Sequence, residues 1–307
     1  MTLASPFLWS AHGLHRVEAA KNMERLREVF AALALRPDDP RQGGIRMNRA
    51  WAIPIVAVAL SQIAVIATSI YLHRALAHRS LRLHPVADVV FRAILWLTTG
   101  QRRQEWVAVH RKHHAFTDRE GDPHSPRLLG FWRVQLFNVY YYARECRNAH
   151  TLATFAPDLP EDRLDRAVFS HGLLGLGVGL TLLCVVIGFW PGLIAGLAHA
   201  VLYVFVLAPL INALGHWRGR QNFENTAYNS RFFAWVSGGE SLHNNHHAYP
   251  RSAKFSVRGA EFDPSWPVIR ALAALHLLVI LGPPVAWARA SAARGVPLRR
   301  VPTRTTG

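Results

Sequence analysis

The stretch Trp51–Leu72, WAIPIVAVALSQIAVIATSIYL, contains no charged residue over 22 positions. A helix needs roughly 20 apolar residues to cross the hydrocarbon core of a bilayer. We therefore expect a membrane-spanning helix over 51–72, and Pro54 is compatible with it because proline is tolerated near the start of a helix. This segment predicts that the chain is an integral membrane protein.

A second charge-free run extends from Ala167 to Trp217 and is 51 residues long. Phe189-Trp190-Pro191-Gly192 interrupts this run with residues typical of a tight turn at a membrane interface. The run therefore predicts two spans, about 168–190 and 193–215, that form a helical hairpin. Together with 51–72 they predict an all-α, integral membrane fold with three spans.

The composition supports a membrane protein over a soluble one. The 307 residues are 50% hydrophobic, with a mean hydropathy of +0.09, yet Lys and Arg outnumber Asp and Glu by 35 to 19. The basic excess is spread over every polar segment instead of one soluble domain, which favours a lipid bilayer as partner and argues against nucleic acid. By the positive-inside rule we expect 73–166 and 218–270 to share the cytoplasmic side, with the hairpin turn facing outward.

Four further segments complete the expected domain organisation. Residues 86–100 predict a short amphipathic or re-entrant helix, and 271–288 an interfacial segment that closes a membrane domain over 51–288. Residues 289–307 form a basic C-terminal tail. Residues 1–50 form an N-terminal extension whose basic residues would lie outside the cell, against the rule.

Two explanations for the N-terminal extension stay open. Translation of the mature protein could start at Met47, or the extension could contain a membrane-dipping segment around 29–35. Residues 1–30 do not resemble a signal peptide, because no long apolar stretch follows the early charges.

Histidines are concentrated in three clusters that follow the apolar segments. They are His73 with His78, the stretch His110-Arg-Lys-His113-His114, and the stretch His243-Asn-Asn-His246-His247, while His216 directly follows the last span. Positions i, i+3 and i+4 share one helix face, so each of the two longer clusters can direct three imidazoles at one spot. His73 and His78 are about 140° apart on an ideal helix and converge only if the helix ends or tightens.

This concentration of imidazoles predicts a metal site. Burying eight or nine of them without a metal would leave unpaired polar groups or repelling charges. Structural zinc takes about four ligands and favours thiolates, but Cys146 and Cys184 are the only two cysteines. Nine nitrogen ligands are too many for one ion and suit two, and imidazole suits iron, which brings redox chemistry. A metal carrier or sensor without turnover is the alternative from another class.

The three clusters resemble the histidine boxes HxxxxH, HxxHH and HxxHH of the membrane fatty acid desaturases, in particular the delta-9 acyl-CoA type and its bacterial relatives. Further matching stretches are Glu105-Trp106, Asp122-Pro123-His124, Asn212-Ala-Leu-Gly-His216 and Gly239-Glu240. The resemblance covers about 51–270. It implies a cytoplasmic, histidine-rich di-iron cap on a helical protein of the bacterial cytoplasmic (inner) membrane.

In that family nine histidines hold two iron ions. The corresponding residues of this chain are His73, His78, His110, His113, His114, His216, His243, His246 and His247. Asn212 matches an asparagine that reaches an iron through water, whereas His124 is not a ligand by resemblance and has a loop-fixing role. Carboxylates at Asp118, Glu120, Asp122 and Glu240 could orient imidazole N–H groups.

The implied reaction uses O2 and two external electrons to place a cis double bond, of the delta-9 type, in a saturated acyl chain. Trp106 is a candidate wall of the acyl tunnel, while Pro209 stands where animal members have a tryptophan. Arg111 and Lys112, with Arg102 and Arg103, could bind the phosphates of coenzyme A or of a phospholipid. A hydroxylase of alkyl or fatty acyl chains is the alternative within oxygen chemistry.

Electrons must come from a separate carrier, because the chain has neither a haem-binding HPGG stretch nor a glycine-rich dinucleotide fingerprint. An acidic ferredoxin-like or haem protein would suit the basic cytoplasmic face by electrostatic steering.

Overall fold

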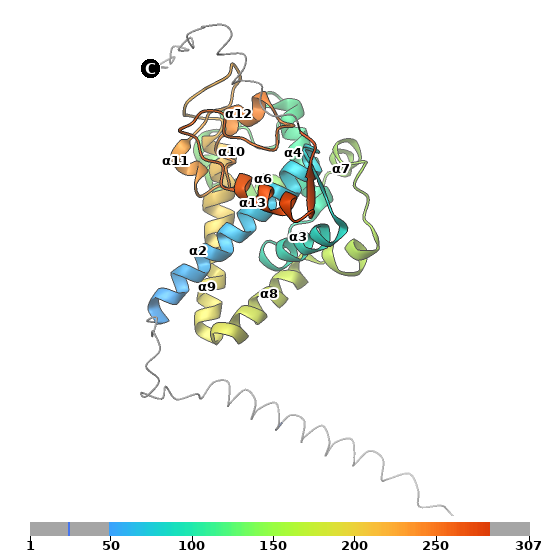
Figure 1. Cartoon of the computed structure of the whole chain (residues 1–307), viewed down its shortest axis with the longest axis vertical. Coiled ribbons are helices and arrows are strands. Elements are labelled where there is room, and N and C mark those ends of the chain that lie inside the picture. The colour runs from blue at the N-terminus through green and yellow to red at the C-terminus, as the bar shows by residue number, and fades with distance from the viewer. Residues whose placement is uncertain (1–23, 25–48, 283–307) are drawn as a thin grey trace, which may run out of the picture.

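A computed structural model of the chain describes Glu24 and residues 49–282 (Figure 1). The expectations for the N-terminal extension and the basic tail lie outside the described residues. The first half of the described chain contains α2 (Arg49–Ala67), η1 (Thr68–Ala77), β1 (Leu81–Leu83), α3 (Pro85–Thr98), α4 (Arg103–Phe116), α5 (Pro126–Leu129), α6 (Phe131–Cys146) and α7 (Ala149–Phe155). The second half contains η2 (Asp165–Phe169), α8 (Gly172–Ile187), α9 (Phe189–Val201), η3 (Leu202–Leu207), α10 (Ala208–Leu214), α11 (Arg231–Ala234), α12 (His243–Ala248), α13 (Ser265–Ala274) and β2 (Leu278–Ile280).

Two apolar helices are long enough to span a membrane. α2 continues into η1 as one helix over Trp51–Ala77, 27 residues long, and α9, η3 and α10 together form a helix over Phe189–Leu214, 26 residues long. Each is about 40 Å long at 1.5 Å per residue, which exceeds the roughly 30 Å hydrocarbon core. The excess length lets these helices carry side chains beyond the apolar layer.

The predicted span 168–190 is shorter in the structure than expected. Its helix, α8, has 16 residues, which is about 24 Å and less than the hydrocarbon thickness. The turn of the hairpin lies at Gly188, with a φ of 97°, and not at Pro191-Gly192, which belongs to the first turn of α9. Glycine is suited to this position because a left-handed φ carries no Cβ penalty.

α8 packs closely against α3, the helix expected as a short amphipathic or re-entrant segment over 86–100. Gly175 makes the close approach possible, because an added Cβ would lie 2.3 Å from the carbonyl oxygen of Trp96. The Trp96 indole N–H in turn donates to the carbonyl of His171, at 3.0 Å. α3 also packs on α2, and α9 packs on both α2 and α8, so the contacts of the four helices form a closed ring.

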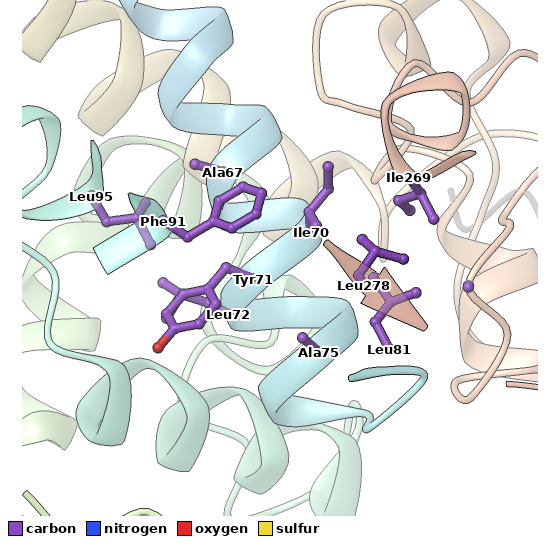
Figure 2. Close-up of a cluster of buried hydrophobic side chains, with 11 residues drawn as sticks. Ala67, Ile70, Tyr71, Leu72, Ala75, Leu81, Phe91, Leu95, Ile269 and Leu278 are labelled. Carbon is purple, nitrogen blue, oxygen red and sulfur yellow. The ribbon is translucent and has the colours of Figure 1, made fainter. Parts of the chain in front are cut away.

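The main hydrophobic core joins η1 to α3 and to the C-terminal elements (Figure 2). The ring of Tyr71 stacks on that of Phe91, with centroids 5.9 Å apart and ring planes at 1°. Leu81 and Leu278 continue the core into a two-stranded antiparallel sheet formed by β1 and β2. The predicted interfacial segment 271–288 is therefore divided, within the described residues, between the end of α13 and strand β2. The class is all-α apart from this small sheet.

The histidine-bearing elements gather at one end of the molecule. α4, α10 and α12 lie together in the upper part of Figure 1, at the opposite end from the turn between α8 and α9. That 73–166 and 218–270 share the cytoplasmic side of a membrane stays a prediction.

Candidate metal centre

The first histidine pair lies in η1, a π-helix in which backbone hydrogen bonds run from residue i to i+5. The amide of His78 donates to the carbonyl of His73 at 3.0 Å. This wider turn brings residues five apart onto one face, as is common for π-helical segments at functional sites. The two histidines do converge, but they do so because the helix is widened and not because it is tightened.

The two longer clusters each divide their histidines between two groups, and this corrects the expectation that each cluster directs three imidazoles at one spot. In α4, His110 and His114 face one group while His113 faces the other. In α12, His243 and His247 face the second group while His246 faces the first. Residues i and i+4 overlie each other on a helix, whereas i+3 is rotated away from them, so one short helix can serve two adjacent sites.

The nine predicted histidines form two centres. Centre A consists of His73, His78, His110, His114 and His246, and centre B consists of His113, His216, His243 and His247. Within each centre the candidate ligand atoms lie within 4.8 Å of one another. The centres are adjacent, because the ring of His114 stacks on that of His247 at a centroid distance of 4.3 Å.

Carboxylates behind the imidazoles determine which ring nitrogen faces each centre. Nδ1 of His113 lies 3.0 Å from both carboxylate oxygens of Asp122, and Nδ1 of His216 lies 2.9 Å from Oδ2 of Asp118. Nδ1 of His73 lies 2.6 Å from Oε2 of Glu240. Such partners fix the tautomer and leave Nε2 unprotonated toward a metal. Three of the four predicted orienting carboxylates take this role.

Glu120, the fourth predicted orienting carboxylate, is exposed and contacts none of the nine imidazoles. Asp118 reaches His216 because its backbone has a φ of 58° just after α4, a left-handed conformation that Asp tolerates better than most residues. The turn places Asp118 toward the site and leaves Glu120 in solvent.

The donor set fits metal ions. Nε2 of His113 lies 3.1 Å from Nε2 of His216, and Nε2 of His216 lies 2.9 Å from Nε2 of His243. Since Asp122 and Asp118 bind the Nδ1 protons of His113 and His216, the facing Nε2 atoms both present lone pairs. In centre A, Nε2 of His78 and His110 lie 2.8 Å apart. Facing lone pairs at these distances repel each other unless a cation lies among them.

Burial favours the neutral form of several imidazoles in both centres, among them His110 and His246 in centre A and His243 in centre B. Burial lowers the pKa of His110 and His246 well below the ordinary histidine value, and repulsion from neighbouring imidazoles lowers it further. Burial alone would raise the pKa of Asp122, but its hydrogen bond and charge interaction with His113 hold that pKa below the ordinary value. Neutral imidazoles backed by ionised carboxylates are the form that binds metal.

Sequence reasoning missed the buried cation beneath centre A. Arg74 has no exposed surface, forms ion pairs with Glu240 at 3.1 Å and Asp263 at 2.9 Å, and lies over the ring of Phe255. Burial of an arginine requires such partners. Its position next to His73 in the sequence is the only signal that could have pointed to it.

The two asparagines within the third cluster also escaped prediction. Asn244 donates to the carbonyls of Phe223 and Ala227, and Oδ1 of Asn245 accepts from Asn222 and Asn229. These bonds attach the six-residue helix α12 to the preceding loop. They hold His243, His246 and His247 in place without adding ligands.

An apolar cavity lies against both centres. It encloses about 1000 Å³ of empty space, part of it open to the surroundings. His73, His110 and His243 line it together with membrane-helix residues and residues of α6. The remaining lining residues are Val65, Thr68, Gln101, Trp106, Val109, His124, Asn138, Val139, Tyr142, Tyr203, Val204, Leu207, Ala208, Ile211, Asn212 and Glu240.

Four further residues that the sequence analysis singled out divide between the cavity wall and its support. Trp106 lines the cavity and stacks on His110 at a centroid distance of 4.8 Å. Asn212 also lines it, and its side-chain amide donates to Oδ1 of Asn138 at 3.0 Å. Pro209 is buried and is not part of the lining. His124 lines the cavity and stacks on His113, and Asp122 accepts from its backbone amide.

The basic residues suggested for phosphate binding are paired within the chain. Arg111 binds Asp158 at 2.5 Å, and Lys112 binds Glu145 at 2.6 Å. Arg102 pairs with Glu105 and Glu161, and Arg103 with Asp162 and Asp165. None of the four lines the cavity. The structure therefore assigns them to supporting the site and gives no support to phosphate binding by Arg111 or Lys112.

Two membrane-length helices that carry a histidine-rich centre beside an apolar cavity define a membrane protein with a nitrogen-ligated metal site. The fatty acid desaturase family model matches residues 49–280. The chain belongs to the fatty acid desaturase family, whose members are oxidoreductases.

Several curated members of the family are similar to the chain. The Delta-9 acyl-lipid desaturase 2 of Arabidopsis thaliana is 32% identical over 225 residues, which cover 72% of this chain and 71% of that protein. The acyl-CoA C20 Delta5-desaturase of Anemone leveillei is 30% identical over 233 residues, covering 74% and 73%. The sn-1 stearoyl-lipid 9-desaturase of a Synechocystis strain is 30% identical over 207 residues, covering 67% of this chain and 64% of that protein. The names of these relatives differ in both bond position and acyl carrier.

Proposed function

We propose that the chain is a membrane fatty acyl desaturase that inserts a cis double bond into a saturated acyl chain. The observation that carries this proposal is the cavity, in which imidazoles of both centres face a space lined largely by apolar side chains of membrane helices. An acyl chain is the ligand whose shape and polarity suit such a space.

Two iron ions, one at each centre, would supply the oxidising power that no acid or base side chain has against an unactivated methylene pair. The overall reaction consumes one O2, two electrons and two protons, removes two hydrogens from the acyl chain and releases two waters. A separate protein must deliver the electrons, because the sequence contains neither a haem-binding nor a dinucleotide-binding motif. We infer nine ligands, with five at centre A and four at centre B.

The side chains of this protein bind and orient. Trp106 and Val109 form the wall next to His110, so they set how closely the acyl chain approaches the centres. Glu240, Asp118 and Asp122 orient His73, His216 and His113. We propose that Asn212 contacts metal through water, as the resemblance implies, and that the apolar lining excludes bulk water from the reacting carbons.

For bond position we propose carbon 9, from the resemblance and from the two relatives whose names carry that position. Pro209 is not part of the lining, whereas its neighbours Ala208 and Ile211 are, and both are smaller than the tryptophan that animal members have in place of Pro209. The shape of this wall decides which carbon pair meets the centres.

For membrane placement we propose the cytoplasmic membrane of a bacterium, with both centres on the cytoplasmic side. The elements beside the centres carry exposed basic residues, among them Arg218, Arg220, Arg251 and Lys254. A basic surface there agrees with the positive-inside rule and would attract an acidic ferredoxin-like or haem protein as electron donor.

Gas chromatography of total fatty acids from a desaturase-deficient host that expresses the chain tests the proposal. We expect a new monounsaturated acid, which disappears in His113→Ala and persists in the control Glu120→Gln. New hydroxy acids without alkenes would replace the proposal by a hydroxylase. An unchanged fatty acid profile together with altered cellular metal content would indicate a carrier or sensor.

A further inference from the structure

The most exposed part of the cavity lining lies on α6. Among the described residues that line the cavity, Val139 alone is exposed, at 41%. Its lining neighbours along the same helix, Asn138 and Tyr142, are buried or half-buried. Val139 therefore marks the part of the lining nearest the molecular surface.

The outer face of α6 around this edge is apolar. Trp132, Leu136, Phe137 and Tyr140 are each more than half exposed, which is unusual for four large apolar residues on one short helix in water. Arg144 lies over the rings of Tyr140 and Tyr141. Aromatic residues beside arginine are typical of a helix at the boundary between hydrocarbon and headgroups.

η3, within the membrane-length helix Phe189–Leu214, lies beside α6 and also contributes to the cavity lining. The side-chain amide of Gln135 in α6 donates to the carbonyl of Phe205 in η3 at 3.1 Å, so the two elements lie side by side. Val204 of η3 lines the cavity, while Phe205 and Val206 are exposed apolar residues next to it. The opening is thus bordered on both sides by apolar surface that suits lipid.

The electrostatics of the cavity disfavour a nucleotide carrier. Among the described residues that line the cavity, none is Lys or Arg. The nearby candidates Arg102, Arg103, Arg111 and Lys112 are neutralised by carboxylates. Coenzyme A is a phosphorylated nucleotide, and its recognition calls for cations free to bind phosphate. These four cations are already held in ion pairs within the chain.

We propose that the cavity takes the acyl chain of an intact membrane lipid, which enters sideways from the bilayer between α6 and η3, past Val139. The substrate class is therefore an acyl-lipid and not an acyl-CoA. This inference rests on the proposed desaturase function. It adds the carrier of the acyl chain and the route of entry.

The test supplies the same stearoyl chain on two carriers to membranes of the expressing host, which contain the electron donor. One arm adds vesicles of phosphatidylglycerol with labelled stearoyl chains, and the other adds labelled stearoyl-CoA while acyl transfer to lipid is blocked. We expect labelled monounsaturated product in the lipid arm. Product only in the CoA arm would overturn the inference and leave the desaturase function standing. Product in neither arm would overturn the function itself.

A variant at the opening tests the route. Val139→Trp is expected to lower conversion of the lipid substrate by at least about tenfold, because misplacing a substrate near its reacting groups is costly. Iron content should be unchanged. Val186→Trp is the matched control, since Val186 is 77% exposed on α8 and does not line the cavity. If Val139→Trp and the smaller change Val139→Phe both retain wild-type conversion, the entry route is wrong.

Discussion

Asn138 of α6 accepts a 3.0 Å hydrogen bond from the side-chain amide of Asn212 in α10. Both residues line the cavity, and Asn138 is buried. Since the amide nitrogen of Asn212 is held by Asn138, its carbonyl oxygen is left free to accept from a water molecule. Asn138 therefore acts as a positioning residue for Asn212.

Replacing Asn138 tests this relationship. Asn138→Ala should lower the rate of product formation by about tenfold, because the side chain of Asn212 would no longer be held in one orientation near the reacting atoms. Asn138→Asp keeps an acceptor of the same shape and should recover part of the rate. Product analysis is paired with iron determination, and loss of iron in Asn138→Ala would mean that the residue is needed for assembly of the centres instead.

The orienting carboxylates should matter for metal retention. Asp122→Asn weakens the partner of His113, and removal of such a partner costs about 10–100-fold in metal affinity or activity. Elemental analysis of purified protein after dialysis against a chelator should show less iron than in wild type. Glu120→Gln is the control, because Glu120 is exposed two residues away. Equal iron contents in the two variants would show that Asp122 does not support centre B.

The buried arginine should contribute to stability. Arg74→Met leaves the carboxylates of Glu240 and Asp263 buried without their cation, which typically costs 3–5 kcal/mol. Denaturant unfolding in detergent should detect this loss. Arg79→Met removes an exposed pair with Asp158 and should cost about 0–1 kcal/mol. Similar stability of both variants would contradict the assigned role of Arg74.

The contact between α3 and α8 depends on a glycine. Gly175→Ala would place a methyl group 2.3 Å from the Trp96 carbonyl oxygen and should destabilise the protein by about 1–3 kcal/mol. At Gly177, on the same helix, an added Cβ meets nothing within 4 Å. Gly177→Ala should therefore be neutral or slightly stabilising. Thermal unfolding of the two variants side by side distinguishes packing from helix propensity.

Much of this architecture can be predicted from the sequence because apolar length and histidine spacing act locally. The charge-free run 51–72 predicts the first long helix, and the clusters at 110–114 and 243–247 predict metal-binding faces. The division of each cluster between two centres is harder to predict. It depends on where neighbouring helices place their own imidazoles, so helical periodicity alone does not reveal it.

Other features either have no signature in residue type or depend on contacts between distant segments. The π-helical hydrogen bond from His78 to His73 has no signature in residue type, and it brings together two side chains that an α-helix would separate. α8 ends at Ile187, because Gly188 with its positive φ terminates the helix, although the charge-free sequence continues. The pairing of Arg111 with Asp158 likewise turns a predicted phosphate-binding residue into a supporting one.

We propose that the nine histidines hold two iron ions, one at each centre. The most direct measurement is the metal content of purified, catalytically active protein by elemental analysis, expressed per chain. Centres A and B together predict two irons per chain. One iron per chain, or zinc as the native metal of active protein, would contradict the claim.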